Sequence, residues 1–134
     1  MTQRIQVVAI GGTTRPNSSS EKALRIAAQA SKDAGAQVSF ITGADLLMPI
    51  YDTQSTERAA ESLHLIEQIR NADGVLISSP GYHGGMSGLI KNAIDYLEDL
   101  SGDRRPYLDG RAVGCVAVAH GWQASVSTLQ QIRQ

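Results

Sequence analysis

The sequence predicts an α/β fold in which one parallel sheet carries helices on both faces. Four short apolar runs (5–10, 37–41, 75–77 and 111–119) alternate with segments whose apolar residues recur at helical spacing. Because crossovers between parallel strands are right-handed, we expect the strand order 2-1-3-4, numbered along the chain. A crossover helix normally returns the chain to the sheet, so a fifth strand is expected after the last helix and is missing from this chain. We therefore expect a chain truncated at its C-terminus, or a partner that covers the edge of the fourth strand.

Length and composition indicate a single domain, residues 1–134, with an ordinary globular core. Hydrophobic residues make up 42% of the chain, charged residues make up 19%, and the net charge is −1. This balance gives no reason to expect a nucleic-acid or membrane surface. No apolar run is long enough to span a bilayer, and no signal peptide precedes the first strand. The single cysteine, Cys115, excludes an internal disulfide and fits a reducing cytoplasm, and no Cys/His cluster has metal-ligand spacing.

The first strand, 5–10, runs into a loop at 11–20 that is rich in glycine, serine and threonine. Ser18 and Glu21 have the spacing of a capping box, so a helix should begin at Ser18 or just after it. The loop thus opens onto a helix N-terminus, which has free N–H groups and a partial positive charge. Arg15 adds a fork of donors that suits phosphate. We interpret the loop as a phosphate cradle; the alternative is a serine-rich cap on an ordinary helix, with Arg15 in solvent.

This loop differs from the two commonest nucleotide-binding motifs. It lacks the Gly-Lys-Ser/Thr of a Walker P-loop, and only Gly11 and Gly12 represent the glycines of a Rossmann G-x-G-x-x-G. Hydroxyl groups take the place of the glycine N–H groups of those motifs. That pattern favours the phosphate of a mononucleotide over a pyrophosphate.

The second strand, 37–41, is weakly apolar, which suggests an edge position. An irregular connection should follow over 45–56, and a second helix is expected over 57–71. His64 has polar neighbours on this helix, so a surface or partly buried position is expected for it. The apolar spacing of the helix predicts three core contacts: Leu63, Ile66 and Ile69.

A glycine-rich junction at 74–97 is the stretch around which we expect the rest of the chain to be organised. It begins as an apolar strand, which Pro80 should end because proline has no N–H to donate. Helical spacing of apolar residues follows over 86–97. Tyr82 and His83 lie between strand and helix. Loops at the carboxyl ends of parallel strands bind ligands, so a ligand is expected here, although an ordinary connection has the same pattern.

The last unit has the same organisation. A polar turn at 101–110 leads into the fourth strand, 111–119, in which Cys115 should be a small buried side chain rather than a nucleophile. Residues 120–122, His-Gly-Trp, form the third loop at a carboxyl end. A helix is expected to begin near Gln123.

Three segments resemble a known family, and the resemblance extends over nearly the whole chain. Residues 12–20, GTTRPNSSS, resemble the phosphate loop G-S-x-R-x-x-S-x-[NS] of the NAD(P)H-dependent FMN reductases. Residues 79–95, SPGYHGGMSGLIKNAID, resemble that family's S-P-x-Y-x-x-x-x-S-G-x-L-K-N-x-x-D segment, and Gly121 matches a glycine of its fourth-strand loop. The chain is most similar to the branch that supplies reduced flavin to two-component monooxygenases. The resemblance implies a flavodoxin-like three-layer sandwich that binds FMN.

The resemblance also implies a set of FMN-binding residues. Four would hold the FMN phosphate: Thr13, Arg15, Ser18 and Ser20. A second group would line the isoalloxazine ring and the ribityl chain, with a glycine beneath the ring: Pro80, Gly81, Tyr82, His83 and Gly84, and Gly121. This chain carries Gly81 and His83 where many relatives have glutamate and asparagine.

The implied activity is transfer of hydride from NADH or NADPH to FMN, with the reduced flavin passed to a partner monooxygenase. The cofactors carry this chemistry, so no catalytic acid or base is expected, and Tyr82 and His83 would position the rings. A homodimer or homotetramer is implied as well. Three alternatives stay open: an FMN-containing quinone, azo-dye or metal-ion reductase, a non-catalytic flavodoxin-like electron carrier, and a binding module without chemistry.

Overall fold

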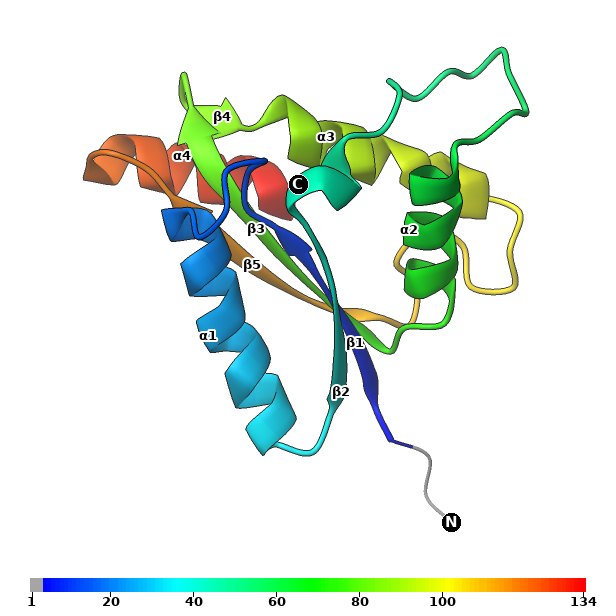
Figure 1. Ribbon diagram of the computed structural model, residues 1–134, viewed down its shortest axis with the longest axis horizontal. Coiled ribbons are helices and arrows are strands. Elements are labelled where there is room, and N and C mark those ends of the chain that lie inside the picture. The colour runs from blue at the N-terminus through cyan, green and yellow to red at the C-terminus, as the bar shows by residue number, and fades with distance from the viewer. Residues whose placement is uncertain (1–3) are drawn as a thin grey trace.

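Parallel pairings between strands build the sheet. In the computed structural model, which describes residues 4–134, β1 (Gln6–Gly11) lies between β2 (Gln37–Thr42) and β3 (Gly74–Tyr82). β3 pairs in turn with β5 (Ala112–Val118), which gives the order β2-β1-β3-β5 (Figure 1). This is the predicted 2-1-3-4 order, because β5 is the expected fourth strand. The predicted fold class is thus confirmed.

One helix covers the first face of this sheet. α1 (Ser19–Asp33) lies there, and its Leu24 and Ala28 pack against Ala9 of β1 in a small core cluster. The helix follows the expected pattern, in which residues four positions apart share a face. α1 therefore forms one outer layer of the sandwich (Figure 1).

The remaining helices cover the opposite face. They contribute to the larger core cluster, which also includes the two short 3-10 helices. None of the helices among residues 4–134 is both long enough and apolar enough to cross a membrane. The elements of this layer are α2 (Ala60–Arg70), α3 (Gly88–Asp95), α4 (Trp122–Arg133), η1 (Gly43–Leu46) and η2 (Tyr96–Leu100).

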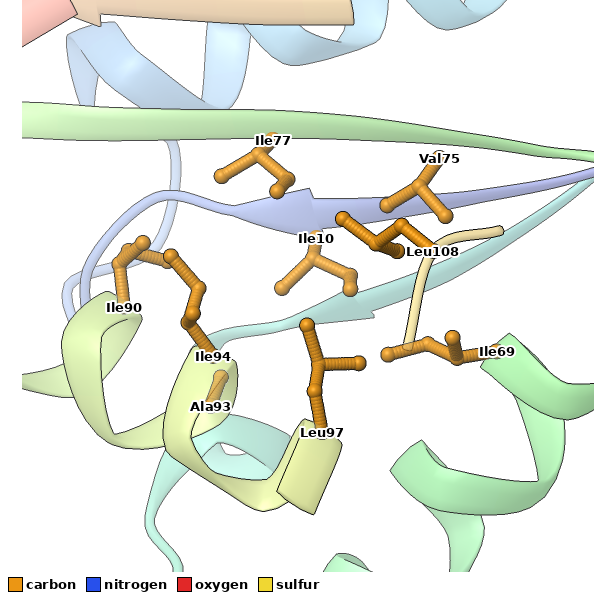
Figure 2. A pocket seen from close by; sticks show the side chains of 9 residues that line it. All are labelled: Ile10, Ile69, Val75, Ile77, Ile90, Ala93, Ile94, Leu97 and Leu108. Atoms are coloured by element: carbon orange, nitrogen blue, oxygen red, sulfur yellow. The ribbon is translucent and has the colours of Figure 1, made fainter. Parts of the chain in front are cut away.

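The larger core lies between the sheet and this second layer. Val8 and Ile10 of β1 face it, together with Val75 and Ile77 of β3, because alternate residues of a strand share a face. A gap with a volume of about 10 Å³ interrupts the packing there (Figure 2). So small a gap with a wholly apolar lining belongs to core packing and not to a ligand site. Its lining consists of Ile10, Ile69, Val75, Ile77, Ile90, Ala93, Ile94, Leu97 and Leu108.

β3 continues through Pro80 to Tyr82, so the prediction that Pro80 ends the strand is wrong. The Gly12 N–H donates to the Ser78 carbonyl (3.2 Å), which shows that the polar backbone groups of Ser78 face β1. These groups alternate in direction along a strand, so the nitrogen of Pro80 also points to the β1 side. β1 has already ended at Gly11, level with Ser78, and β3 therefore continues along β5 without losing a hydrogen bond.

A tight hairpin, and not a helix, follows β3. Gly81 and Tyr82 pair antiparallel with β4 (Gly85–Met86), a strand that the sequence does not predict. The two residues of the turn, His83 and Gly84, both have positive φ values, 53° and 81°. Two consecutive positive φ values mark a type I′ turn, whose twist matches that of a two-residue hairpin.

The third helix is consequently shorter than the predicted 86–97. α3 begins after Ser87, whose Oγ accepts a hydrogen bond from the Ile90 N–H (3.3 Å). A serine at this position fixes the start of a helix because it satisfies a first-turn N–H group. α3 ends at Asp95, and η2 continues the chain in the tighter 3-10 form.

The second helix is shorter than predicted, and one of the three core contacts predicted for it is wrong. Leu63 is 54% exposed, and Leu65 is buried in its place. His64 is exposed, as expected. The buried residues of α2 follow the spacing i, i+3, i+4, i+7: Ser62, Leu65, Ile66 and Ile69.

β5 lies at an edge of the sheet within the part of the chain that the structure describes. It pairs with β3 there and with no other strand. Cys115, in the middle of β5, is partly buried rather than fully buried, and its burial raises the pKa of the thiol. A higher thiol pKa means less thiolate, which agrees with the expectation that Cys115 is not a nucleophile.

Candidate functional site

Three loops meet at the carboxyl ends of β1, β3 and β5. A hollow with a volume of about 230 Å³ lies at this edge of the sheet. Ligands of open parallel sheets bind at this edge, so the hollow is the candidate site. Its lining comes from the β1–α1 loop, from the end of β3, and from the end of β5 with the two residues after it: Thr13, Arg15, Ser18, Ser19, Ser20, Pro80, Gly81, Tyr82, Val118, Ala119 and His120.

Most of the residues that the sequence singles out meet in this hollow. Three of them, His83, Gly84 and Gly121, stand outside its lining. The binding roles of all ten stay predictions. Those that line the hollow are Thr13, Arg15, Ser18, Ser20, Pro80, Gly81 and Tyr82.

The loop between β1 and α1 turns sharply over two glycines. Gly12 has a φ of 89°, and a Cβ at this position would lie 3.0 Å from the Cβ of Glu21. A Cβ at Gly11 would lie 2.5 Å from the Ser78 carbonyl oxygen. Both positions therefore need glycine, which allows the loop backbone to approach both β3 and α1.

Serine hydroxyls shape the N-terminus of α1. Ser18 Oγ accepts a hydrogen bond from the Glu21 N–H (3.3 Å), which confirms the predicted cap. It also lies 3.3 Å from Ser20 Oγ, and the two serines are only 3% and 2% exposed. The first intrahelical bond runs from the Lys22 N–H to the Ser18 carbonyl. The N–H groups of Ser19 and Ser20 precede this bond, so they have no partner within the helix.

Among residues 4–134, Arg15 is the only one in the lining whose side chain carries a permanent charge. It is exposed, and its backbone N–H donates to Thr13 Oγ1 (3.1 Å). Its guanidinium forms no ion pair with any residue in the described range, 4–134. This fork of donors is therefore open to a ligand.

The end of β3 forms the opposite wall of the hollow. Pro80, Gly81 and Tyr82 contribute to it, and Tyr82 is 53% exposed. His83 and Gly84 form the exposed hairpin turn instead. Glycine adopts positive φ freely and histidine does so more readily than most residues, so this pair suits the turn.

Four lining residues escape the sequence reasoning. Ser19 lies between two predicted residues, Val118 ends β5, and Ala119 and His120 follow it. The sequence identifies the loop after this strand, yet it singles out Gly121, which is the N-cap of α4 with a φ of 86°. Pairing β5 with β3 places Val118 opposite Pro80, so the register of the two strands is the signal that finds these residues.

The donors of the hollow suit a phosphate group. Hydroxyls, free N–H groups of the first helical turn and one guanidinium converge from the β1–α1 loop. No carboxylate belongs to the lining among residues 4–134. Glu21, which is close by, is buried and forms an ion pair with Arg25 (3.2 Å). An anion would therefore meet donors without a competing negative charge.

Comparison with known proteins agrees with this arrangement. The family model described as NADPH-dependent FMN reductase matches residues 5–134. A quinone reductase from Escherichia coli (strain K12) is 36% identical over 104 residues, which are 75% of this chain and 54% of that protein. An FMN reductase (NADPH) from Pseudomonas aeruginosa is 30% identical over 100 residues, which are 73% of this chain and 54% of that protein.

Solved structures share the fold. FerB, a flavoenzyme NAD(P)H:(acceptor) oxidoreductase from Paracoccus denitrificans, has a TM-score of 0.77 at 18% identity, over 96% of this chain and 68% of its own. The chain spans about half the length of the two curated relatives described above. On its sequence match, and with a flavodoxin-like fold, the chain belongs to the NADPH-dependent FMN reductase family.

Proposed function

We propose that this protein is an FMN reductase that accepts hydride from NADH or NADPH. The observation that carries the proposal is the set of uncommitted donors at the N-terminus of α1, which opens into a hollow shared with the ends of β3 and β5. A phosphate and a flat ring are the two ends of FMN. The donors suit the first, and the largely apolar wall opposite suits the second. Membership of the family supports the same reading.

The phosphate end of the site would consist of side chains and backbone from one loop. Thr13, Arg15, Ser18 and Ser20 would hold the phosphate, and the N–H of Ser19 would add a donor at the positive end of the helix. The guanidinium supplies the charge, and the hydroxyls and N–H groups supply direction. Recognition at this end would distinguish FMN from riboflavin, which lacks the phosphate.

The ring end of the site would be the wall made by β3 and β5. Pro80, Gly81 and Tyr82 would line one side of the flavin, and His120 lies at the end of the other strand. His83, Gly84 and Gly121 would act through the backbone conformation of their loops, since they do not line the hollow.

Bound FMN supplies the redox chemistry, because its ring accepts a hydride from a reduced nicotinamide. The task of the chain is to bind and orient the rings and to leave one side of the site accessible. The exposed side chains of Tyr82 and His120 border this open side. No acid or base is required from the lining for the hydride step.

A second candidate is a reductase that passes the electrons on to a quinone or an azo dye. A quinone reductase is 36% identical to this chain, and an NADPH azoreductase from Bacillus sp. (strain OY1-2) is 30% identical over 86 residues. Both activities would begin with the same hydride step. Supply of reduced flavin to a partner monooxygenase, and assembly as a homodimer or homotetramer, are further parts of the proposal that rest on the sequence resemblance.

Anaerobic flavin titration tests the proposal. The purified chain is titrated with FMN and, in parallel, with riboflavin, and NADH or NADPH is then added. We expect saturable binding that is tighter for FMN, followed by bleaching of the oxidised flavin absorption. Binding without bleaching would indicate an electron carrier, and a lack of binding would refute the proposal. Reoxidation by a benzoquinone or an azo dye that outpaces reoxidation by excess FMN would favour the second candidate.

A further inference from the structure

The hairpin that forms one wall of the hollow is too small to be rigid by itself. Its ladder consists of two residue pairs, Gly81 with Met86 and Tyr82 with Gly85. A short two-stranded hairpin is at best marginally stable in water. At its base, the Ser87 N–H donates to Ser79 Oγ (2.9 Å), which fixes where the hairpin starts and ends. The turn itself needs support from elsewhere in the chain.

α4 supplies that support through two hydrogen bonds. Gln131 Oε1 accepts from the Met86 N–H (2.6 Å), and Ser127 Oγ donates to the Gly84 carbonyl (2.9 Å). The first bond holds the returning strand, and the second holds the turn. α4 and β4 lie side by side (Figure 1).

The hairpin backbone also lies directly against its support. A Cβ at Gly81 would lie 2.7 Å from both Ala119 Cβ and Thr128 Oγ1. A Cβ at Gly85 would lie 2.7 Å from Gln131 Oε1. At Gly81 no side chain fits between the hairpin and the short, rigid side chains of Ala119 and Thr128, so this part of the hairpin is tied to the position of α4. At Gly85 the close atom is the end of the flexible Gln131 side chain, which is the hydrogen-bond acceptor itself.

We propose that Gln131 and Ser127 are positioning residues for the flavin ring. Neither lines the hollow, so they act through the hairpin, whose first strand carries the lining residues Pro80, Gly81 and Tyr82. The inference rests on the proposed function, because it assumes that this wall faces a bound flavin. The site then has two parts: affinity for the ring depends on α4, whereas affinity for the phosphate depends on the β1–α1 loop.

Variants of Gln131 test the inference with matched controls. Gln131→Met removes the acceptor and preserves the length of the side chain, and Gln131→Glu retains an acceptor. Gln130→Met is the control, because Gln130 is exposed and belongs to the same helix. We expect Gln131→Met to bind FMN and riboflavin alike about three- to tenfold more weakly, the effect of one lost hydrogen bond. The flavin affinities of Gln131→Glu and Gln130→Met should stay close to those of the wild type. Ser127→Ala should weaken the binding of both flavins, whereas Ser127→Thr should not.

Amide hydrogen exchange in the flavin-free protein separates this inference from the proposed function. The Met86 N–H should exchange faster in Gln131→Met than in the wild type, Gln131→Glu or Gln130→Met. Unchanged exchange would overturn the contact itself. Faster exchange with unchanged affinity for both flavins would overturn the positioning role, as would a loss of affinity for FMN alone. A wild-type chain that binds neither flavin would refute the proposed function and the positioning role together, although the exchange result would still report on the contact.

Discussion

Two hollows lie at opposite ends of the sheet. They differ in how many of their hydrogen-bond donors already bond to the protein itself. The hollow at the carboxyl ends of the strands has a volume of about 230 Å³ and a lining with one arginine. The hollow at the amino ends has a volume of about 590 Å³. Size and charge would favour this second hollow as a binding site. Its lining consists of Arg70, Asp103, Arg104, Arg105 and Arg111.

Arg111 is committed to the fold. It is 7% exposed, and it donates through Nε to the Ile69 carbonyl (2.8 Å), through Nη2 to the Arg70 carbonyl (2.9 Å) and through Nη1 to the Tyr107 carbonyl (2.9 Å). The first two carbonyls end α2, so the guanidinium caps that helix and ties the 101–111 segment to it. Burial lowers the pKa of Arg111, the direction expected for a cation removed from water.

Two further arginines of this hollow are committed as well. Arg70 forms ion pairs with Asp103 (2.8 Å) and Glu67 (2.7 Å). Arg105 Nη2 donates to the carbonyls of Arg70 and Ala72. Arg15, in the smaller hollow, has no ion-pair partner among residues 4–134. Arg104, which is exposed, has no ion-pair partner in this range either. The candidate site is distinguished instead by serine hydroxyls and free first-turn N–H groups beside its guanidinium, whereas three of the four arginines of the larger hollow are bound to the protein itself.

Loss of the Arg111 guanidinium should produce the largest effect. Arg111→Met would remove the charged hydrogen bonds to the carbonyls of Ile69, Arg70 and Tyr107, and we expect the free energy of unfolding to fall by about 3–5 kcal/mol. FMN affinity of the folded protein should stay unchanged, because the candidate site lies at the other end of the sheet. Urea unfolding and flavin titration measure the two quantities. A loss of stability below about 1 kcal/mol would contradict the view that Arg111 is structural.

Arg15→Ala should give the reverse pattern. We expect FMN binding to weaken by about 1.5–3 kcal/mol, the range for a hydrogen bond to a charged group. Riboflavin binding and the free energy of unfolding should hardly change, because Arg15 is exposed and would contact only the phosphate. Isothermal titration with both flavins measures the difference. Equal losses for FMN and riboflavin would remove Arg15 from the phosphate end of the site.

A smaller effect is expected at one buried hydroxyl in each of the helices that support the two hollows. Ser62 Oγ in α2 and Thr128 Oγ1 in α4 have no hydrogen-bond partner among residues 4–134. A buried hydroxyl without a partner costs desolvation energy, so Ser62→Ala and Thr128→Val should each raise the free energy of unfolding by about 1 kcal/mol. Urea unfolding tests both variants. A decrease in either would indicate that a bound water satisfies the hydroxyl.

The smallest effect concerns an ion pair that belongs to neither hollow. Arg58 donates to Asp99 through Nε to Oδ2 (2.6 Å) and through Nη2 to Oδ1 (2.9 Å). This contact holds the pKa of Asp99 below its usual 3.8. A carboxyl whose pKa is lower in the folded state stabilises the protein above its unfolded pKa, and that contribution is lost as the pH falls below it. The difference in the free energy of unfolding between the wild type and Asp99→Asn should therefore be largest near neutral pH and shrink below about pH 4. A difference that does not vary with pH would contradict the linkage.

The sequence predicts the features that depend on local pattern. Apolar runs and right-handed crossovers are sufficient for the strand order, and the spacing of Ser18 and Glu21 is sufficient for the cap of α1. The β1–α1 loop and the end of β3 are correctly expected at one edge of the sheet, because parallel strands end there together. Most of the residues that line the candidate site can therefore be identified from the sequence alone.

The features that the sequence does not predict depend on distant partners. Met86 fits the helical spacing of 86–97, yet it pairs with Gly81 and is held by Gln131, 45 positions further along the chain. The 101–110 segment is polar enough to suggest a solvated turn, yet Arg105 reaches the end of α2. In both cases the deciding hydrogen bond joins segments that local pattern cannot bring together.

The packing around Gly81 restricts the order in which this sequence can change. The space for a side chain at position 81 is already filled by Ala119 and Thr128, each 2.7 Å from where a Cβ would be. The three positions are therefore epistatic: a larger residue at 81 becomes acceptable only after both neighbours have become smaller. A library that varies position 81 alone should return glycine, whereas one that varies all three positions together should return correlated sets of residues.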